Sequence, residues 1–170
     1  MTSLLLAVLM LSASSAMPYV PVKHNNSTFQ CPPTTCPDAD TNHIKAAMQT
    51  FAHEFYTAKD VSGAFNTFVA EDYIQHNAGI LSGREAAINS LGPLFGSAVN
   101  TFDVKRLTVG QDTDNNTMVI IHLEASNTSS NQTMKTDVVD MYRVVGTCIV
   151  EHWDVLQAEE SNPENPLAYF

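Results

Sequence analysis

The chain has 170 residues, of which 44% are hydrophobic, and this suits one domain with a single core and short accessory segments. Its 18 acidic and 8 basic residues give a formal net charge of −10. The sequence contains no cluster of Lys and Arg that could follow a phosphate backbone, so we expect no nucleic-acid partner.

The N-terminus predicts a secretory signal peptide over residues 1–16. An apolar block at residues 4–11 is followed by small residues, with Ser14 and Ala16 at the −3 and −1 positions of a cleavage site. The block is too short to span a membrane, and no later segment reaches the length of a spanning helix. We therefore expect a secreted, extracellular protein with no membrane partner.

Residues 17–39 are rich in Pro, Asn, Ser and Thr and predict an extended, glycosylated tail rather than part of the core. Sequons for N-glycosylation support the secretion hypothesis, because each one falls in this tail or in a predicted loop. The predicted glycosylation sites are Asn25, Asn26, Asn115, Asn127 and Asn131.

The sequence has three cysteines. Cys31 and Cys36 frame the proline-stiffened segment CPPTTC, which predicts a small disulfide between them after export. Cys148 would then be an unpaired, buried and unreactive thiol in a strand. A Cys36–Cys148 bridge that ties the tail to the sheet is the alternative.

Helical periodicity predicts three helices after the tail. The first is capped by Asp40 or Thr41, and its apolar residues follow the i, i+3, i+4, i+7 spacing to residue 55. A shorter helix follows Asp60. The third begins at a capping box, Ser82–Glu85, and ends or kinks at Gly92-Pro93.

After about residue 100 the apolar residues alternate, which predicts four antiparallel strands separated by turns. Helices followed by antiparallel strands define an α+β domain, which we place at residues 40–157, with an acidic tail at 158–170. A strongly curved sheet against the helices would leave a cone-shaped cavity suited to a small molecule. The predicted strands are 102–109, 118–125, 133–145 and 148–157.

A run of polar residues, EDYIQHNAGI at 71–80, lies between the second and third predicted helices. Polar side chains are costly to bury unless each finds a partner, so the run indicates either a structural network or one wall of a site. Its central part, DYIQHN at 72–77, is extended in character but too short for a full strand. Alternation places Tyr73, Gln75 and Asn77 on one side and Ile74 and His76 on the other.

A second run, EHWDVLQ at 151–157, lies on the last predicted strand, where His152 and Asp154 share the face opposite to Trp153. A two-residue loop at Gly146-Thr147 would put Asp140 beside Trp153, whereas a three-residue loop would put it beside His152 and Asp154. Only the second register brings both carboxylates and the histidine into one cavity. The sequence leaves the register open.

This combination of side chains suits proton transfer. A carboxylate in an apolar pocket has a raised pKa and serves as a general base or acid near neutral pH. A histidine across the cavity takes the opposite role or donates to a developing enolate oxygen. Neutral Tyr, Gln and Asn donors orient a carbonyl group. The expected chemistry is proton abstraction next to a carbonyl, as in aldol, cyclisation, isomerisation or dehydration steps.

Residues 41–157 resemble the SnoaL-like polyketide cyclase family, within the nuclear-transport-factor-two-like and ketosteroid-isomerase-like superfamily. The resemblance lies in AEDYIQHNAGILSGREAAINSL (70–91) and VVDMYRVVGTCIVEHWDVLQ (138–157). It implies a cone-shaped fold of three N-terminal helices packed on a strongly curved antiparallel β-sheet. It also implies a homodimer through the sheet, no metal and no organic cofactor.

The resemblance further implies site residues. Asp154 matches an aspartate that acts as acid and base in an intramolecular aldol closure, and His152 matches a neighbouring active-site histidine. Asp140 stands where the cyclases carry another histidine, and His76 belongs to the family branch with the DYIQHN motif. These four are the candidate catalytic residues. The candidate pocket residues are Tyr73, Gln75, Asn77, Tyr142 and Trp153.

Simpler roles stay open for these residues. Asp154 could form an ion pair with Arg143, His76 could bridge the helices and the sheet, and Trp153 could be a core or pocket-wall side chain. Three functions follow from the alternatives. The protein is a cofactor-independent lyase or isomerase acting on a hydrophobic carbonyl compound, a non-catalytic binder of a small hydrophobic molecule, or an interaction protein with a filled cone.

Overall fold

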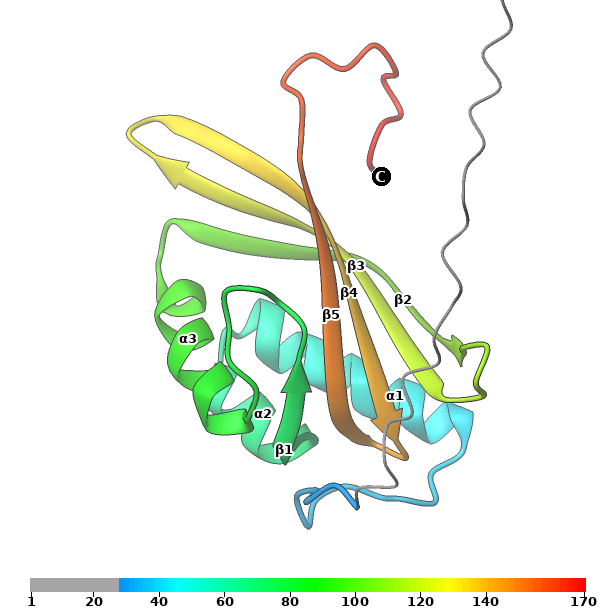
Figure 1. The fold of residues 1–170 in the computed structure, drawn as a ribbon. Coiled ribbons are helices and arrows are strands. Elements are labelled where there is room, and N and C mark those ends of the chain that lie inside the picture. Colours follow the sequence, from blue (N-terminus) through cyan, green and yellow to red (C-terminus); the bar gives the residue numbers. More distant parts are fainter. Residues whose placement is uncertain (1–27) are drawn as a thin grey trace, which may run out of the picture.

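The computed structural model describes residues 28–170 of the chain (Figure 1). The predicted signal peptide at residues 1–16 and the sequons Asn25 and Asn26 lie outside the described residues. Within residues 28–170, no helix has both the length and the apolar character needed to cross a membrane.

Three α-helices form one layer of the fold: α1 (Thr41–Ala52), α2 (Val61–Phe68) and α3 (Arg84–Gly96). The first two have the predicted caps, because Asp40 accepts a hydrogen bond from the His43 N–H at 2.8 Å and Asp60 accepts one from the Gly63 N–H at 2.8 Å. Their N-termini are therefore fixed by local sequence.

A π-helical turn, His53–Thr57, continues α1. The wider turn changes the spacing of side chains, and the adjacent residues Phe55 and Tyr56 are both buried, with 3% and 1% of their surface exposed. The simple helical spacing predicted burial only for Phe55. The π-turn thus adds Tyr56 to the residues that face the sheet.

The start and end of α3 differ from the prediction. The capping box at Ser82–Glu85 does not form: Gly83 is the N-cap, with φ of +100° and no side-chain cap. The Ser82 hydroxyl instead accepts from the Gln75 N–H at 3.1 Å. The helix also continues past Pro93 to Gly96, and this last turn places Phe95 in the core between other aromatic rings. Burial of that ring offsets the backbone hydrogen bond lost at the proline.

The second layer is a five-stranded sheet in the order β1-β5-β4-β3-β2. Strands β2 to β5 are the four predicted antiparallel strands, but β1 is a full strand that pairs in parallel with β5. The prediction that DYIQHN, at 72–77, is too short for a full strand is therefore wrong, since β1 is a seven-residue strand that includes its first four residues. The bounds are β1 Val69–Gln75, β2 Asn100–Gln111, β3 Thr117–Ser129, β4 Gln132–Val145 and β5 Cys148–Ala158.

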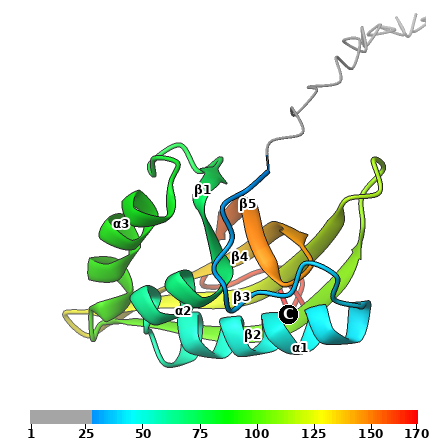
Figure 2. The same cartoon turned by 90° about the horizontal axis from the view of Figure 1, so that it is seen from below.

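The core lies between the helices and the inner face of the sheet. Figure 2 shows α1 and α2 crossing that face. Met48 and Phe51 from α1 meet Ile121 of β3 and Tyr142 of β4 in one buried cluster. The inner face is thereby covered along α1, while the part nearer α3 borders a cavity.

Cys31 and Cys148 form a disulfide, with 5.9 Å between their Cα atoms. The predicted Cys31–Cys36 bridge is therefore wrong, and so are the unpaired Cys148 and the Cys36–Cys148 alternative. The path of the N-terminal segment explains the pairing. The Gln30 carbonyl accepts from the Glu71 N–H at 2.8 Å, which holds Cys31 near the β1–β5 edge, while Cys36 is exposed with a free thiol.

After β5 the chain folds back as a loop (Figure 1). The Glu159 N–H donates to the Lys135 carbonyl at 3.0 Å, and the Phe170 ring packs against His122 with 4.9 Å between ring centroids. Tyr169 from this segment lines part of the cavity. Residues 159–170 therefore contribute to the outer part of the cavity wall.

Candidate functional site

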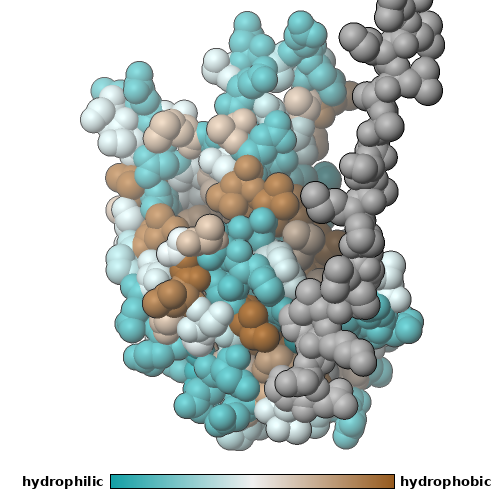
Figure 3. Space-filling view, viewed as in Figure 1, coloured by the Kyte–Doolittle hydropathy of each residue, from teal (hydrophilic) through white to brown (hydrophobic). Residues whose placement is uncertain are grey.

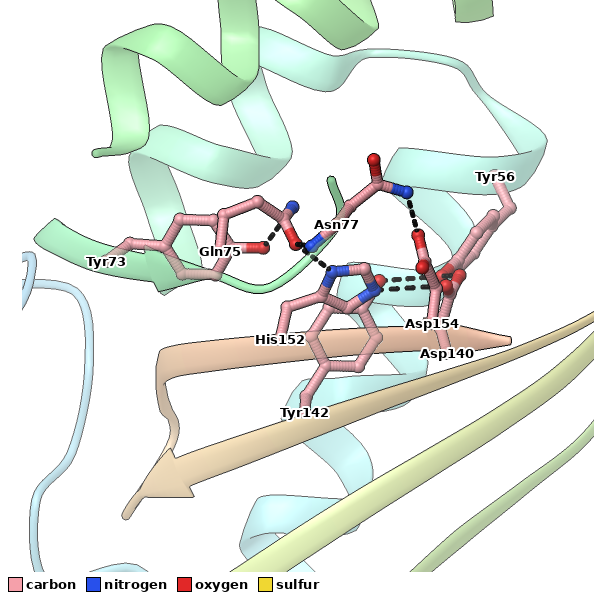
Figure 4. A network of polar contacts seen from close by, with 8 residues as sticks. All are labelled: Tyr56, Tyr73, Gln75, Asn77, Asp140, Tyr142, His152 and Asp154. Atoms are coloured by element: carbon pink, nitrogen blue, oxygen red, sulfur yellow. Dashed lines mark hydrogen bonds and ion pairs between the residues drawn. The ribbon is translucent and has the colours of Figure 1, made fainter. Parts of the chain in front are cut away.

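A cavity of about 1050 Å³ lies between the helices and the inner face of the sheet, a size that suits a small organic molecule. Much of its wall is apolar. The Phe95 ring stacks between two others, with its centroid 4.2 Å from Phe55 and 4.0 Å from Phe102. A concentration of polar side chains occupies one part of the wall (Figure 4). These are Tyr56, Tyr73, Gln75, Asn77, Asp140, Tyr142, His152 and Asp154.

The register of the β4–β5 hairpin places both aspartates on this wall. The hairpin loop has two residues, since Val145 pairs with Cys148, and that register alone would set Asp140 opposite Trp153. A β-bulge at Val150 shifts the pairing by one residue, so that Asp140 lies opposite Asp154. The predicted alternative with both carboxylates and His152 in one cavity is confirmed, although a bulge rather than a longer loop produces it.

His152 and Asp140 form a hydrogen-bonded pair at the polar wall. The His152 Nε2 lies 3.0 Å from one Asp140 oxygen, and the Tyr56 hydroxyl donates to the other at 2.5 Å. The Tyr142 hydroxyl lies 2.7 Å from that of Tyr56 and donates to it, because the Tyr56 proton is already engaged with the carboxylate. Asp140 thus takes part in a network of four side chains.

Gln75 fixes which nitrogen of His152 faces Asp140. The Gln75 Oε1 accepts from the Asn77 N–H at 2.9 Å, and it also lies 2.8 Å from the His152 Nδ1. Since this oxygen can only accept, the Nδ1 carries a proton and the Nε2 faces the carboxylate. The amide nitrogen of Gln75 donates to the Tyr73 hydroxyl at 3.1 Å. The Asp140–His152 pair therefore shares one exchangeable proton between oxygen and Nε2.

Asp154 lies at the same wall and is held from β1. The Asn77 side-chain amide donates to one of its oxygens at 2.5 Å. Within residues 28–170, the other oxygen has no hydrogen-bond partner, and Asp154 lines the cavity. The alternative of an ion pair with Arg143 is wrong, because Arg143 is on the outer face and donates to Glu151 at 2.6 Å. One Asp154 oxygen is thus available to a ligand.

His76 and Trp153 lie on the outer face of the sheet, away from the cavity. The placement of both in the pocket was wrong, and strand alternation gives the reason, because their neighbours Gln75, Asn77 and Asp154 face inward. The His76 ring stacks on Trp153 with 4.6 Å between centroids, and its Nε2 lies 2.7 Å from the fully buried Glu151 carboxylate. This cluster ties the end of β1 to β5.

Burial keeps the cavity phenols protonated. It raises the pKa of Tyr56 well above the usual 10.0, and the nearby negative charge of Asp140 raises it further. The same two causes, in the same order, raise the pKa values of Tyr73 and Tyr142. All three hydroxyls are therefore proton donors at neutral pH.

Three of these residues also have the donor set for a metal ion. Ligand atoms of Asp140, His152 and Asp154 lie within 4.8 Å of one another. The Nδ1–H bond to Gln75 leaves the Nε2 of His152 facing inward, which is the usual orientation of a histidine ligand. The cluster can therefore receive a positive charge in the form of a proton or another cation.

The sequence did not indicate Tyr56, Phe95 or Phe102 as site residues. Tyr56 faces the cavity because it lies in a π-helical turn, whose side-chain spacing differs from the α-helical spacing used for the prediction. Phe95 lies beyond the proline at which the helix was expected to end or kink. The aromatic pair Phe55–Tyr56 at the end of a helical pattern was the only available signal for a widened turn.

The described chain has a cone-shaped α+β architecture of three helices packed on a curved sheet, as the resemblance to SnoaL-like cyclases predicted. No protein-family model matches the sequence, and no curated protein matches it. Solved structures do match.

TsrD from Streptomyces laurentii aligns with a TM-score of 0.54 at 13% identity, over 70% of this chain and 91% of its own. A candidate polyketide cyclase from Acidithiobacillus ferrooxidans aligns with a TM-score of 0.54 at 15% identity, over 69% and 90%. A candidate polyketide cyclase from Bacillus cereus aligns with a TM-score of 0.54 at 20% identity, over 75% of this chain and 87% of its own. At these identities the likeness establishes the fold.

Proposed function

We propose that the protein catalyses cofactor-independent proton transfer on a hydrophobic carbonyl compound, in an aldol, cyclisation or isomerisation step. The observation that carries the proposal is the open oxygen of Asp154, whose carboxylate lies within 4.8 Å of the Asp140–His152 pair in a largely apolar cavity. A base and a proton donor at this separation can reach the α-hydrogen and the oxygen of one carbonyl group.

The two parts of the site have different roles in this proposal. Asp154 removes the α-proton, and Asn77 holds its carboxylate in place through the other oxygen. The proton shared by His152 and Asp140 moves to the carbonyl oxygen as the enolate forms. Gln75 keeps the Nδ1 protonated throughout, so that only the Nε2 exchanges a proton. The same groups then return a proton to carbon or complete a new carbon–carbon bond.

The test is exchange of the α-protons of 2-tetralone in deuterated buffer, followed by NMR. We expect the protein to accelerate exchange, and Asp154→Asn to reduce the acceleration about a hundredfold or more. Asp114→Asn is the matched control, since Asp114 is exposed in the β2–β3 turn. Neither substitution creates a new sequon. A ketone that binds without any enhanced exchange would contradict catalysis and leave a ligand-binding protein.

We also propose that the protein is secreted and N-glycosylated. The Cys31–Cys148 disulfide supports secretion, because such bonds persist in oxidising compartments. Asn115 and Asn131 are exposed at turns between strands and suit glycans. Asn127 does not, because its side-chain amide donates to Asn100 at 2.5 Å and it lines the cavity. Peptide mapping after endoglycosidase treatment would show occupancy at Asn115 and Asn131 and none at Asn127.

A homodimer through the outer face of the sheet is the further part of the proposal. Apolar side chains gather among polar ones in the middle of the face seen in Figure 3. On the outer face, Ile120 and Val155 are 41% and 57% exposed. Contiguous apolar area of this kind favours association. Sedimentation of the wild type against Ile120→Lys tests it, with a dimer expected only for the wild type.

A further inference from the structure

The charges around the cavity are mostly negative. The described lining residues include the carboxylates of Asp140, Asp154, Glu159 and Glu160, against one lysine. That lysine, Lys135, places its ammonium 3.0 Å from the Glu124 carboxylate. A concave site lined by one sign of charge raises the local concentration of ligands of opposite charge. The cavity therefore favours cations over anions.

Within the polar wall, Asp154 is the carboxylate that keeps one oxygen open to the cavity. Asp140 accepts a hydrogen bond from Tyr56 and shares a proton with His152, whereas Asp154 accepts one bond from Asn77 and presents its other oxygen to the cavity. A neutral amide compensates a carboxylate less well than a charged donor does. An ammonium group at this oxygen would complete the pairing of Asp154.

Aromatic rings border the same region. Tyr56, whose hydroxyl contacts Asp140, has its ring centroid 6.1 Å from that of Phe95 and 6.4 Å from that of Phe102. Aromatic faces attract organic cations, and the attraction grows when the site excludes water. Carboxylates beside aromatic rings form a recognition site for a protonated amine that carries an apolar body.

We propose that the cavity selects hydrophobic compounds that carry a protonated amine. The ammonium N–H is donated to one lone pair of the open Asp154 oxygen, and the second lone pair of that oxygen stays directed at the α-proton. The inference rests on the proposed function in one respect: it narrows the substrate to a hydrophobic carbonyl compound with a basic nitrogen. The positive charge also has a chemical use, because it offsets the negative charge of an enolate formed beside the Asp140 carboxylate. We favour an organic ammonium over a metal ion as the occupant, because a metal ion alone would make no contact with most of the apolar wall.

The experiment compares three bicyclic probes of similar size by calorimetry with the full protein at neutral pH. They are 2-aminotetralin, which is cationic, 2-tetralol, which is neutral, and tetralin-2-carboxylate, which is anionic. We expect the amine to bind about tenfold or more tightly than the alcohol, and the carboxylate most weakly. Asp154→Asn should remove the preference for the amine over 2-tetralol, and Asp114→Asn should leave that preference unchanged.

Equal affinity for the amine and the alcohol would overturn the inference, as would no detectable binding of the amine. Tight binding of Zn²⁺ that Asp154→Asn abolishes, without an amine preference, would also overturn it and assign a metal site instead. The calorimetric result can be told apart from the test of the proposed function, which measures exchange of the α-protons of 2-tetralone. Exchange without amine preference would end only this inference, and amine preference without exchange would end only the catalytic proposal.

Discussion

Asp140 and Asp154 lie directly opposite each other on β4 and β5, because a bulge at Val150 shifts the hairpin by one residue. Without that shift Asp140 would face Trp153, and the two carboxylates would lie on opposite sides of the sheet. The bulge therefore brings together the groups that the proposed chemistry requires. Val150 itself is fully buried beside the Cys31–Cys148 disulfide, in a cluster that holds the start of β5.

Loss of the disulfide should destabilise the protein. The bond joins residues 117 positions apart, so replacement of Cys148 by Ser should lower the free energy of unfolding by about 2–5 kcal/mol. Chemical denaturation provides the measurement. Cys36→Ser is the control, because Cys36 is exposed and free, and it should leave stability unchanged. Equal stability of the Cys148→Ser variant and the wild type would show that the bridge does not form.

Tyr56→Phe should lower both stability and proton-transfer activity. The substitution removes the bond to Asp140 and the acceptor for Tyr142, at a cost of about 1–3 kcal/mol. The ring and its packing against Phe55 stay in place. Thermal unfolding and 2-tetralone exchange measure the two effects, and Tyr169→Phe at the outer wall serves as the comparison. If Tyr56→Phe exchanged the α-protons of 2-tetralone as fast as the wild type, the hydrogen bonds of Tyr56 would have no part in the mechanism.

Stability should fall steeply above about pH 10. The folded-state pKa values of Tyr56, Tyr73 and Tyr142 lie above the usual 10.0, so the folded protein holds these protons more tightly than the unfolded chain does. Their contribution is complete below that pH and is lost as the pH rises through the folded values. Ultraviolet titration should show these three tyrosines ionising only as the protein unfolds. Early ionisation of all tyrosines would contradict the buried network.

His76→Phe should affect stability and leave the cavity intact. Phenylalanine retains the stack on Trp153 but removes one partner of the buried Glu151 carboxylate, at a cost of about 1–3 kcal/mol. The affinity for 2-tetralone should stay the same in calorimetry. His152→Gln gives the contrast, since it should impair exchange. A loss of ketone affinity in His76→Phe would show that the outer cluster governs the inner wall.

Much of the site followed from local patterns in the sequence. Strand alternation correctly grouped Tyr73, Gln75 and Asn77, and it grouped His152 with Asp154, because side-chain direction depends only on position in the strand. The resemblance to SnoaL-like proteins supplied the architecture. Alternation also placed His76 and Gln75 on opposite faces of the strand, and this prediction is correct. The resemblance to the DYIQHN motif had instead placed His76 in the active site.

The remaining features depend on contacts between distant residues. The parallel pairing of β1 with β5 and the Cys31–Cys148 bond join segments far apart in the chain, and no local pattern encodes them. The bulge at Val150 leaves no composition signal, since no glycine marks it. The π-turn at Tyr56 is stabilised by packing and by Asp140, 84 positions away. Tertiary structure thus sets the register and the network.

The most direct measurement is a crystal structure of the protein with bound 2-tetralone. We expect the ketone oxygen to lie within hydrogen-bond distance of the His152–Asp140 pair, with the α-carbon facing the open oxygen of Asp154. A ketone bound elsewhere, or one in the cavity with its carbonyl turned away from both groups, would contradict the central claim that these residues form one reactive site.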